Sequence, residues 1–309
     1  MEQTPAQDAS PRVSVILVSR NNAPAIRACL ESLERSANRP ELEILLVDNG
    51  SLDDCPRLDA EFPSLHLHRL PRNFGMVKAL NIAMRTARGE FFLILQPPAL
   101  VDPGTIPALL AKLEEAGAAA ICPLAVSPEG RPLTRIHPLP LPNELFRACN
   151  EGDFADWAAP PADRSSEVDF FHPPILLVRA YFLKAIRFLD ERYGEHWWDL
   201  EICTHLRKAG KQILLLPSLP VRLAAEERQT PPSPAIRALL AADRFLGAAV
   251  WTGKHYGAWQ GWKFRLRALA RVLSGALLSL VTFRDTSFRL ALLADFVTGQ
   301  KIDGSQRGL

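Results

Sequence analysis

The sequence predicts an α/β fold in which a mostly parallel, Rossmann-like sheet is flanked by helices and followed by a C-terminal helical appendage. Short apolar runs rich in β-branched residues alternate with amphipathic segments of helical length over the first 120 residues. This alternation is typical of a parallel sheet covered on both faces. Three prolines at positions 231, 232 and 234 then precede a long region of helical periodicity. The chain is long enough to bury a large core.

Composition excludes several classes of protein. The 309 residues are 48% hydrophobic and 23% charged, with a net charge of +2, so neither a disordered chain nor a nucleic-acid partner is expected. Five cysteines without CxxC spacing are typical of reduced, buried thiols and do not indicate a zinc site. The first residues are polar and lack a basic-then-apolar leader, so a cytoplasmic location is expected.

The elements follow from apolar periodicity and turn residues. Strands are expected at residues 13–19, 44–47, 66–70 and 91–95, and helices at 23–36, 53–62 and 76–86. Asp102 is expected to cap a helix that begins at Pro103 and ends near residue 116. Residues 127–166 are rich in proline and are expected to form a long loop. A late strand at 213–216 follows a helix that ends near residue 209.

Five segments carry a family resemblance. They are V-S-V-I-L-V-S-R-N-N (13–22), I-L-L-V-D-N-G-S-L-D-D (44–54), R-N-F-G (72–75), A-L-N-I-A (79–83) and A-R-G-E-F-F-L-I-L (87–95). Together they resemble the family 2 glycosyltransferases, which are inverting enzymes of the GT-A fold. The D-N-G-S run followed by R-N-F-G is similar to rhamnosyltransferase-like members that build cell-surface polysaccharide. The resemblance extends over residues 13–223 and is strongest in the first hundred residues.

The resemblance implies a domain organisation and a reaction. Residues 1–11 would be a disordered lead, 12–225 the GT-A domain and 226–309 an amphipathic helical region. The expected reaction moves a sugar from a nucleotide-sugar donor, a UDP- or dTDP-sugar, to a saccharide or lipid-linked acceptor. In a single displacement of this kind, a carboxylate takes the proton of the acceptor hydroxyl and a nucleoside diphosphate leaves.

The resemblance also implies a set of donor-binding residues at the carboxyl edge of the sheet, where open α/β folds bind ligands. Asp48 would accept a hydrogen bond from a pyrimidine N–H, and residues 73–75 would shape the loop around the ribose. The alternative is that residues 48–51 form a tight turn that caps the next helix. The implied set is Ser19, Arg20, Asn21, Asp48, Asn49, Asn73, Gly75, Lys78 and Gln96.

The sequence departs from the family where an aspartate normally holds a divalent metal. Residues 96–99 read Gln-Pro-Pro-Ala and contain no carboxylate, and residues 217–223 lack the histidine that often supplies a second ligand. Mg²⁺ and Mn²⁺ need oxygen ligands, so a metal is doubtful. Either side chains neutralise the charge of the leaving group, or the domain is catalytically inactive. An inactive domain would bind a nucleotide sugar or a partner enzyme and organise polysaccharide assembly. The candidate cations are Arg20, Arg72, Lys78 and Arg222.

The segment Y-G-E-H-W-W-D-L-E-I-C (193–203) resembles the part of the family that supplies the catalytic base. Asp199 keeps the aspartate, and Trp198 replaces the preceding glutamate. Asp199 is therefore the candidate base; the alternative is that it caps a helix. Glu195 and His196 are nearby substitutes. His172 is expected to be structural.

The region from 235 to 298 is expected to be helical, with basic residues on one face and apolar residues on another. The basic face comprises Lys263, Arg267 and Arg271, and the apolar face comprises Trp262, Leu266, Leu269, Leu273 and Leu277. The uncharged run at 272–283 is too short to cross a bilayer. Two interpretations remain: residues 259–283 lie on the inner, anionic face of the cell membrane, or the helices form a lid on the catalytic domain.

Overall fold

The computed structural model describes residues 10–160, 164–172, 174–224 and 233–300. The expected lead (apart from residues 10 and 11), Pro231 and Pro232 lie outside these ranges. The strands are β1 (Val13–Ser19), β2 (Leu42–Asp48), β3 (Leu65–Arg69), β4 (Phe91–Leu95), β5 (Ala99–Leu100), β6 (Ala120–Val126), β7 (Ile136–His137), β8 (Ser166–Glu167), β9 (Phe170–Phe171), β10 (Ile175–Arg179) and β11 (Ile213–Leu223).

Helices connect these strands, and three more helices follow the last strand among the described residues. They are α1 (Ala23–Glu34), α2 (Leu58–Glu61), α3 (Met76–Thr86), α4 (Thr105–Glu115), α5 (Pro142–Glu151), α6 (Ala180–Ala185), α7 (Trp198–Lys208), α8 (Pro234–Tyr256), α9 (Ala258–Thr282) and α10 (Thr286–Thr298), with 3₁₀ turns at Arg39–Glu41 and Cys55–Arg57. The mixed α/β architecture and the C-terminal helices confirm the predicted fold class.

One large sheet organises the molecule, in the strand order β3-β2-β1-β4-β10-β6-β11-β5, with β8 paired to β11. The first four strands of this order are mutually parallel. Strand β10 is inserted antiparallel between β4 and β6. Because the first four strands run in one direction, the polar residues that follow β1, β2 and β4 meet at one edge.

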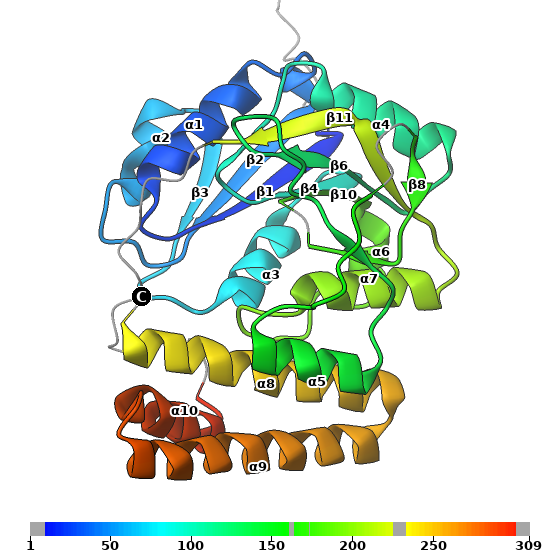
Figure 1. Cartoon of the computed structure of the whole chain (residues 1–309). Coiled ribbons are helices and arrows are strands. Elements are labelled where there is room, and N and C mark those ends of the chain that lie inside the picture. The colour runs from blue at the N-terminus through cyan, green and yellow to red at the C-terminus, as the bar shows by residue number, and fades with distance from the viewer. Residues whose placement is uncertain (1–9, 161–163, 173, 225–232, 301–309) are drawn as a thin grey trace, which may run out of the picture.

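Helices cover both faces of the sheet, and each face has its own hydrophobic core. The core under α1 and α4 contains the buried residues Ile26, Cys29, Leu30 and Leu33 of α1, as their spacing predicted. On the other face α3 and α7 lie nearest the sheet, α5 and α8 form the next layer, and α9 and α10 are outermost (Figure 1). All five cysteines are free and buried.

Three expectations need correction. Helix α4 begins at Thr105 with Gly104 as its N-cap, so Asp102 does not cap it. The late strand continues to Leu223 past an irregularity between Leu216 and Pro220. The stretch 127–166 is not one long loop, because it contains the ten-residue helix α5. Pro142 occupies its first turn, and the Leu141 backbone N–H donates to Glu144 Oε2 at 2.7 Å.

The last three helices share a core with the α/β layer. Trp251 of α8 and Phe264 of α9 belong to the same buried cluster as Trp198 of α7. Helices α8 and α9 approach so closely that a Cβ atom added to Gly261 would lie 2.6 Å from the Gly253 Cα atom. Within the described ranges, no helix combines the length and apolarity needed to cross a membrane.

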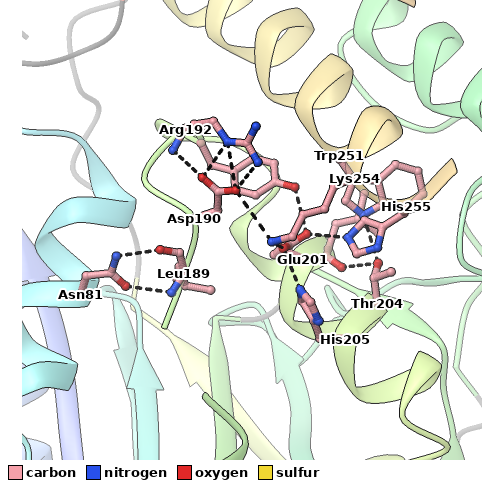
Figure 2. A network of polar contacts seen from close by, with 12 residues as sticks. Asn81, Leu189, Asp190, Arg192, Glu201, Thr204, His205, Trp251, Lys254 and His255 are labelled. Atoms are coloured by element: carbon pink, nitrogen blue, oxygen red, sulfur yellow. Dashed lines mark hydrogen bonds and ion pairs between the residues drawn. The ribbon is translucent and has the colours of Figure 1, made fainter. Parts of the chain in front are cut away.

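A buried carboxylate fastens α7 to α8. Glu201 has only 1% of its side chain exposed, and His205 Nε2 lies 2.9 Å from its Oε1. From α8, Lys254 forms an ion pair with Oε1 and His255 Nε2 lies 2.8 Å from Oε2. Tyr193 Oη donates to Oε2 at 2.9 Å. Figure 2 shows the donors converging on this carboxylate from both helices.

These contacts hold the pKa of Glu201 well below its usual range, because the hydrogen bonds from His205, His255 and Lys254 outweigh burial, which acts in the opposite direction. A glutamate in the unfolded chain has a pKa of about 4.3. Because the pKa of Glu201 is lower in the folded protein, its carboxylate stabilises the fold at pH values above about 4.3, and this stability is lost as the pH falls. Nearby, Trp251 Nε1 donates to Thr204 Oγ1 at 3.1 Å and joins the same two helices.

Replacing Glu201 by glutamine should lower the free energy of unfolding by about 3–5 kcal/mol, because it removes the buried carboxylate that pairs with Lys254 and turns an amide NH₂ group toward one of the remaining donors. Chemical denaturation at neutral pH measures this loss. Glu61→Gln is the control, since the Arg27–Glu61 ion pair is exposed and screened by solvent and should contribute little to stability. Equal losses in the two variants would contradict the role given to Glu201.

The close contact between α8 and α9 gives a second prediction. Gly261→Ala should lower the free energy of unfolding by about 1–3 kcal/mol, because its methyl group meets backbone and one helix must shift. Gly275→Ala in the same helix is the control, because the nearest atoms there are the ends of flexible arginine side chains. That control should be neutral or stabilising by up to about 1 kcal/mol, and thermal denaturation compares the two variants.

Candidate functional site

A cleft of about 380 Å³ opens at the carboxyl ends of β1 and β4. Ligands bind at this edge in open α/β sheets. Its walls come from the turn after β1, the loops after β2 and β4, the start of α3, the segment before α7, and α8. The lining residues are Val18, Ser19, Arg20, Asn21, Asn22, Asn49, Asn73, Met76, Leu80, Ile94, Leu95, Gln96, Pro97, Glu195 and Leu240.

The turn after β1 is held by side chains that cross to the segment after β2. Asn21 has a positive φ of 52°. Its backbone N–H donates to Ser51 Oγ at 3.0 Å, and its Oδ1 accepts from the Leu52 N–H at 2.8 Å. Ser19 Oγ donates to Asn22 Oδ1 at 2.5 Å. These contacts fix the turn, so Ser19, Arg20 and Asn21 present a preformed surface to the cleft.

The loop at 72–75 is fixed in the same way. Asn49 Nδ2 donates to Asn73 Oδ1 at 2.8 Å, and Asn49 Oδ1 accepts from the Phe74 N–H at 2.8 Å. Gly50 has a φ of 77°, and a Cβ atom there would lie 2.5 Å from the Arg72 carbonyl carbon. Only glycine allows the two loops to approach this closely. Asn49 and Asn73 therefore reach the cleft as a hydrogen-bonded pair.

Two ionisable residues, Arg20 and Glu195, line the same cleft. Arg20 lines it with a buried Nε that has no hydrogen-bond partner among the described residues. Burial lowers the pKa of Arg20, while the charges of Glu195 and Asp48 oppose that shift. Burial and the charge of Asp243 raise the pKa of Glu195 to about 7. Asp243 itself accepts hydrogen bonds from the Glu195 and His196 backbone N–H groups.

Some residues implied by the resemblance do not line this cleft. Asp48 is buried, and its Oδ1 accepts the Ser51 N–H at 3.1 Å, which is the tight-turn contact. Gly75 is the N-cap of α3, and its carbonyl accepts from Asn49 Nδ2 at 3.4 Å. Lys78 is exposed, and its Nζ lies 4.8 Å from the centre of the Phe74 ring.

Among the candidate cations, Arg20 lines the cleft and the others do not. Arg72 lies over the Phe74 ring at 5.0 Å. Arg222 is exposed in β11, where it pairs with Leu100 of β5. Ser19, Asn21, Asn49, Asn73 and Gln96 lie with Arg20 in the cleft wall.

The donor atoms at this edge do not fit a magnesium or manganese site. Gln96 and Pro97 occupy the end of β4, and Ala99 continues into β5. Glu195 is the sole carboxylate among the residues that line the cleft, and with a pKa of about 7 it is partly protonated at neutral pH. Hard divalent cations require several oxygen ligands. We therefore derive no chemical step through a metal here.

Three other side chains could hold a metal by position alone. Glu201, His205 and His255 each offer a ligand atom, and these atoms lie within 4.8 Å of one another (Figure 2). None of the three lines the cleft. Lys254 already forms an ion pair with the same carboxylate, so the site carries its own cation. We assign this cluster to the attachment of α8.

Asp199 does not line the cleft. Trp197 occupies the N-cap position of α7, so Asp199 does not cap this helix. Its side chain is 3% exposed, its Oδ1 accepts the Leu200 N–H at 2.9 Å, and its Oδ2 lies 2.5 Å from His172 Nδ1. The neighbouring Trp198, which replaces the family's glutamate, is buried in the core.

His172 lines a second cleft of about 240 Å³ that shares Gln96 and Pro97 with the first. The other lining residues are Pro98, Ala125, Leu133, Thr134, Pro174 and Leu223. The Gln96 N–H donates to the Pro174 carbonyl at 2.7 Å and ties the two walls together. The sequence analysis missed this pairing of His172 with Asp199, because the two residues are 27 positions apart.

The sequence is similar to those of several known proteins. Residues 14–155 match the family described as Glycosyl transferase family 2. An N-acetylglucosaminyl-diphospho-decaprenol L-rhamnosyltransferase of Mycobacterium tuberculosis is 29% identical over 233 residues, which cover 67% of this chain and 74% of that protein. An N-acetylglucosaminyltransferase of Mesorhizobium japonicum is 30% identical over 48% of this chain and 36% of that protein.

Solved structures share the fold. A mannosyltransferase from Pyrobaculum calidifontis, in complex with GDP-Man and Mn²⁺, superposes with a TM-score of 0.54 and 20% identity, covering 94% of this chain and 88% of that one. Residues 1–349 of S. aureus TarS superpose with a TM-score of 0.54 and 15% identity, covering 94% and 92%. These similarities confirm the predicted GT-A fold.

Proposed function

Because the chain belongs to the family 2 glycosyltransferases, we propose that it moves a sugar from a UDP- or dTDP-sugar to a saccharide or lipid-linked acceptor. The acceptor serves cell-surface polysaccharide synthesis, and the leaving diphosphate is stabilised without a divalent metal. The observation that carries this proposal is Arg20, which lines a cleft at the expected edge of the sheet and whose buried Nε has no hydrogen-bond partner among the described residues.

Side chains take the place of the metal in this proposal. A guanidinium group presents a fork of donors that matches phosphate oxygens, and its charge persists at any physiological pH. The amides of Asn73 and Gln96 line the same cleft and supply neutral donors. A diphosphate brought between Arg20 and Glu195 favours the protonated form of Glu195, because two adjacent anions repel each other.

The acceptor class is supported by a relative. The Mycobacterium tuberculosis protein is named as acting on a diphospho-decaprenol-linked sugar. An acceptor of this chemistry is held in a membrane by its polyprenyl chain. An enzyme that uses it must work at the membrane surface.

We propose that α9 and α10 supply that surface contact, at the inner face of the cell membrane. Twelve of the sixteen large hydrophobic side chains that are exposed in the described residues lie between Tyr256 and Val297. Helix α9 buries Gly261, Phe264, Ala268 and Val272 against its neighbours. The stripe predicted from the sequence therefore faces outward, with Trp262, Leu266, Leu273 and Leu277 exposed and Leu269 half-buried.

The charge of α9 selects an anionic partner. The helix contains four basic residues and no acidic residue. Trp259 and Trp262 stack at 4.8 Å, and Lys263 Nζ lies 5.3 Å from the centre of the Trp259 ring. Arg267 is also exposed, but its guanidinium packs over Phe146, 4.0 Å from the ring centre. Exposed aromatic and aliphatic residues beside exposed cations are the features of a helix that lies in a bilayer interface.

The alternative is that the domain is catalytically inactive and binds a nucleotide sugar or organises polysaccharide assembly. The missing metal-binding aspartate favours it. The preformed cleft with an unpartnered arginine, and the histidine–aspartate pair beside it, favour the enzyme. Release of nucleoside diphosphate from a bound donor distinguishes the two.

Arg20→Met should weaken the binding of a UDP- or dTDP-sugar by about 10- to 100-fold, since a hydrogen bond to a charged group contributes about 1.5–3 kcal/mol. Calorimetry with the wild-type protein should give the same affinity in EDTA and in Mn²⁺. Arg72→Met is the matched control, because Arg72 does not line the cleft. Donor binding that appears only with Mn²⁺ would contradict the metal-free proposal, and no binding of any donor would contradict the function.

Reversing the charges of Lys263, Arg265 and Arg271 should weaken binding to phosphatidylglycerol vesicles by at least about a hundredfold, because each cation near an anionic surface contributes about 1 kcal/mol. Vesicle flotation measures the bound fraction. The control carries the same charge change at Arg57, Lys112 and Arg131, which are exposed on the α/β layer. If both variants float as the wild type does, the surface assignment is wrong and the lid interpretation stands.

A further inference from the structure

We infer that His172, oriented by Asp199, accepts the proton of the attacking hydroxyl group, and that the second cleft holds the acceptor. This inference rests on the proposed transferase function and changes the role of Asp199 within it. The sequence resemblance pointed to Asp199 as the base. The geometry instead makes Asp199 a positioning residue, because it acts on the reaction through the imidazole.

Asp199 is poorly placed to touch an acceptor. Its side chain is 3% exposed, and both of its oxygens are already engaged, one by the Leu200 N–H and the other by His172 Nδ1. A general base must come within hydrogen-bond reach of the proton that it removes. Neither Asp199 oxygen reaches the cleft except through the imidazole ring of His172.

His172 has the opposite properties. Its side chain is 70% exposed and lines the second cleft. When Nδ1–H donates to the Asp199 carboxylate, the neutral ring presents Nε2 as an acceptor. No hydrogen bond joins Nε2 to another residue in the described part of the chain. A buried carboxylate behind an exposed imidazole fixes the tautomer and stabilises the imidazolium that forms when the proton arrives.

The two clefts are arranged for a direct displacement. They share Gln96 and Pro97, so a sugar at the end of the donor cleft lies against the mouth of the second. The acceptor oxygen forms a bond to the anomeric carbon as the bond from that carbon to the phosphate oxygen breaks. The bonding electrons leave with the nucleoside diphosphate, and the hydroxyl proton moves to His172 Nε2. The imidazolium then releases this proton to water.

The charges around His172 set its titration. Asp199 raises the pKa of His172 above its usual value; partial desolvation of the ring by the neighbouring protein opposes this shift, Asp153 adds to it and Arg135 reduces it. A base must be neutral to accept a proton. Activity should therefore increase as the pH rises through the raised pKa of His172 and be lost below it. Without the Asp199 charge the pKa falls, so the acid limb of the profile should move to lower pH.

Donor hydrolysis tests the inference without a known acceptor, because water can occupy the acceptor position. Release of nucleoside diphosphate from UDP-, dTDP- and GDP-sugars is measured for the wild type, His172→Gln, Asp199→Asn and His66→Gln. His172→Gln should lower kcat at least about a hundredfold, leave donor affinity by calorimetry within about threefold, and abolish the acid limb. Asp199→Asn should lower kcat and shift that limb to lower pH. His66 is exposed and lines neither cleft, so His66→Gln should behave as the wild type.

The outcomes separate this inference from the function on which it rests. If the wild type turns over a donor and His172→Gln retains at least a tenth of the rate with an unchanged acid limb, His172 is not the base and the transferase stands. If the wild type binds a donor and releases no nucleoside diphosphate with water or with saccharide acceptors, the transferase proposal fails, and this inference fails with it. Loss of donor binding in His172→Gln would place His172 in donor recognition and overturn its role as the base.

Discussion

The structure depends on the Glu201 carboxylate, which is buried between α7 and α8 and accepts donors from both helices. Helix α7 carries Asp199 two residues before Glu201. Helix α8 carries Leu240, which lines the first cleft, and Asp243, which accepts a hydrogen bond from the Glu195 backbone N–H. Because Glu201 fixes these helices relative to each other, it also fixes Leu240 in the wall of the first cleft and Asp199, which contacts His172 of the second cleft. The cost of burying this carboxylate is offset by hydrogen bonds from four side chains and by the opposite charge of Lys254.

In the proposed function, preorganised side chains take the place of a metal ion. The turn after β1 and the loop at 72–75 are locked by asparagine and serine side chains, so the cleft needs little rearrangement to receive a ligand. Fixed dipoles and charges in a partly buried cleft stabilise a developing anion more strongly than water does. Arg20 supplies the positive charge, and Glu195, with its pKa near 7, can lose its negative charge when an anion binds. The end of β4 can therefore carry prolines instead of an acidic motif.

Much of the fold could be predicted from local pattern, and long-range geometry marks where prediction stopped. The strands at 13–19 and 91–95 and the helix at 76–86 were predicted to the residue, because their apolar periodicity and flanking turns are unambiguous. Helix α5 was missed, although Pro142 and Glu144 carry a helix-start signal, because prolines on either side suggested a loop. The antiparallel insertion of β10, the approach of α8 to the cleft and the pairing of His172 with Asp199 depend on contacts between distant segments. Composition and spacing do not encode such contacts.

The shared core of α8, α9 and the α/β layer has a consequence for how the molecule can be divided. Leu240 is part of a cleft wall, Trp251 packs in the same cluster as Trp198, and two of the donors to Glu201 come from α8. Removing the last three helices would therefore open one wall of the cleft and leave the Glu201 carboxylate without two of its partners. The remaining residues would not form an independent catalytic domain. Amino-acid composition changes near residue 225, but residues on both sides of this position pack into one continuous core.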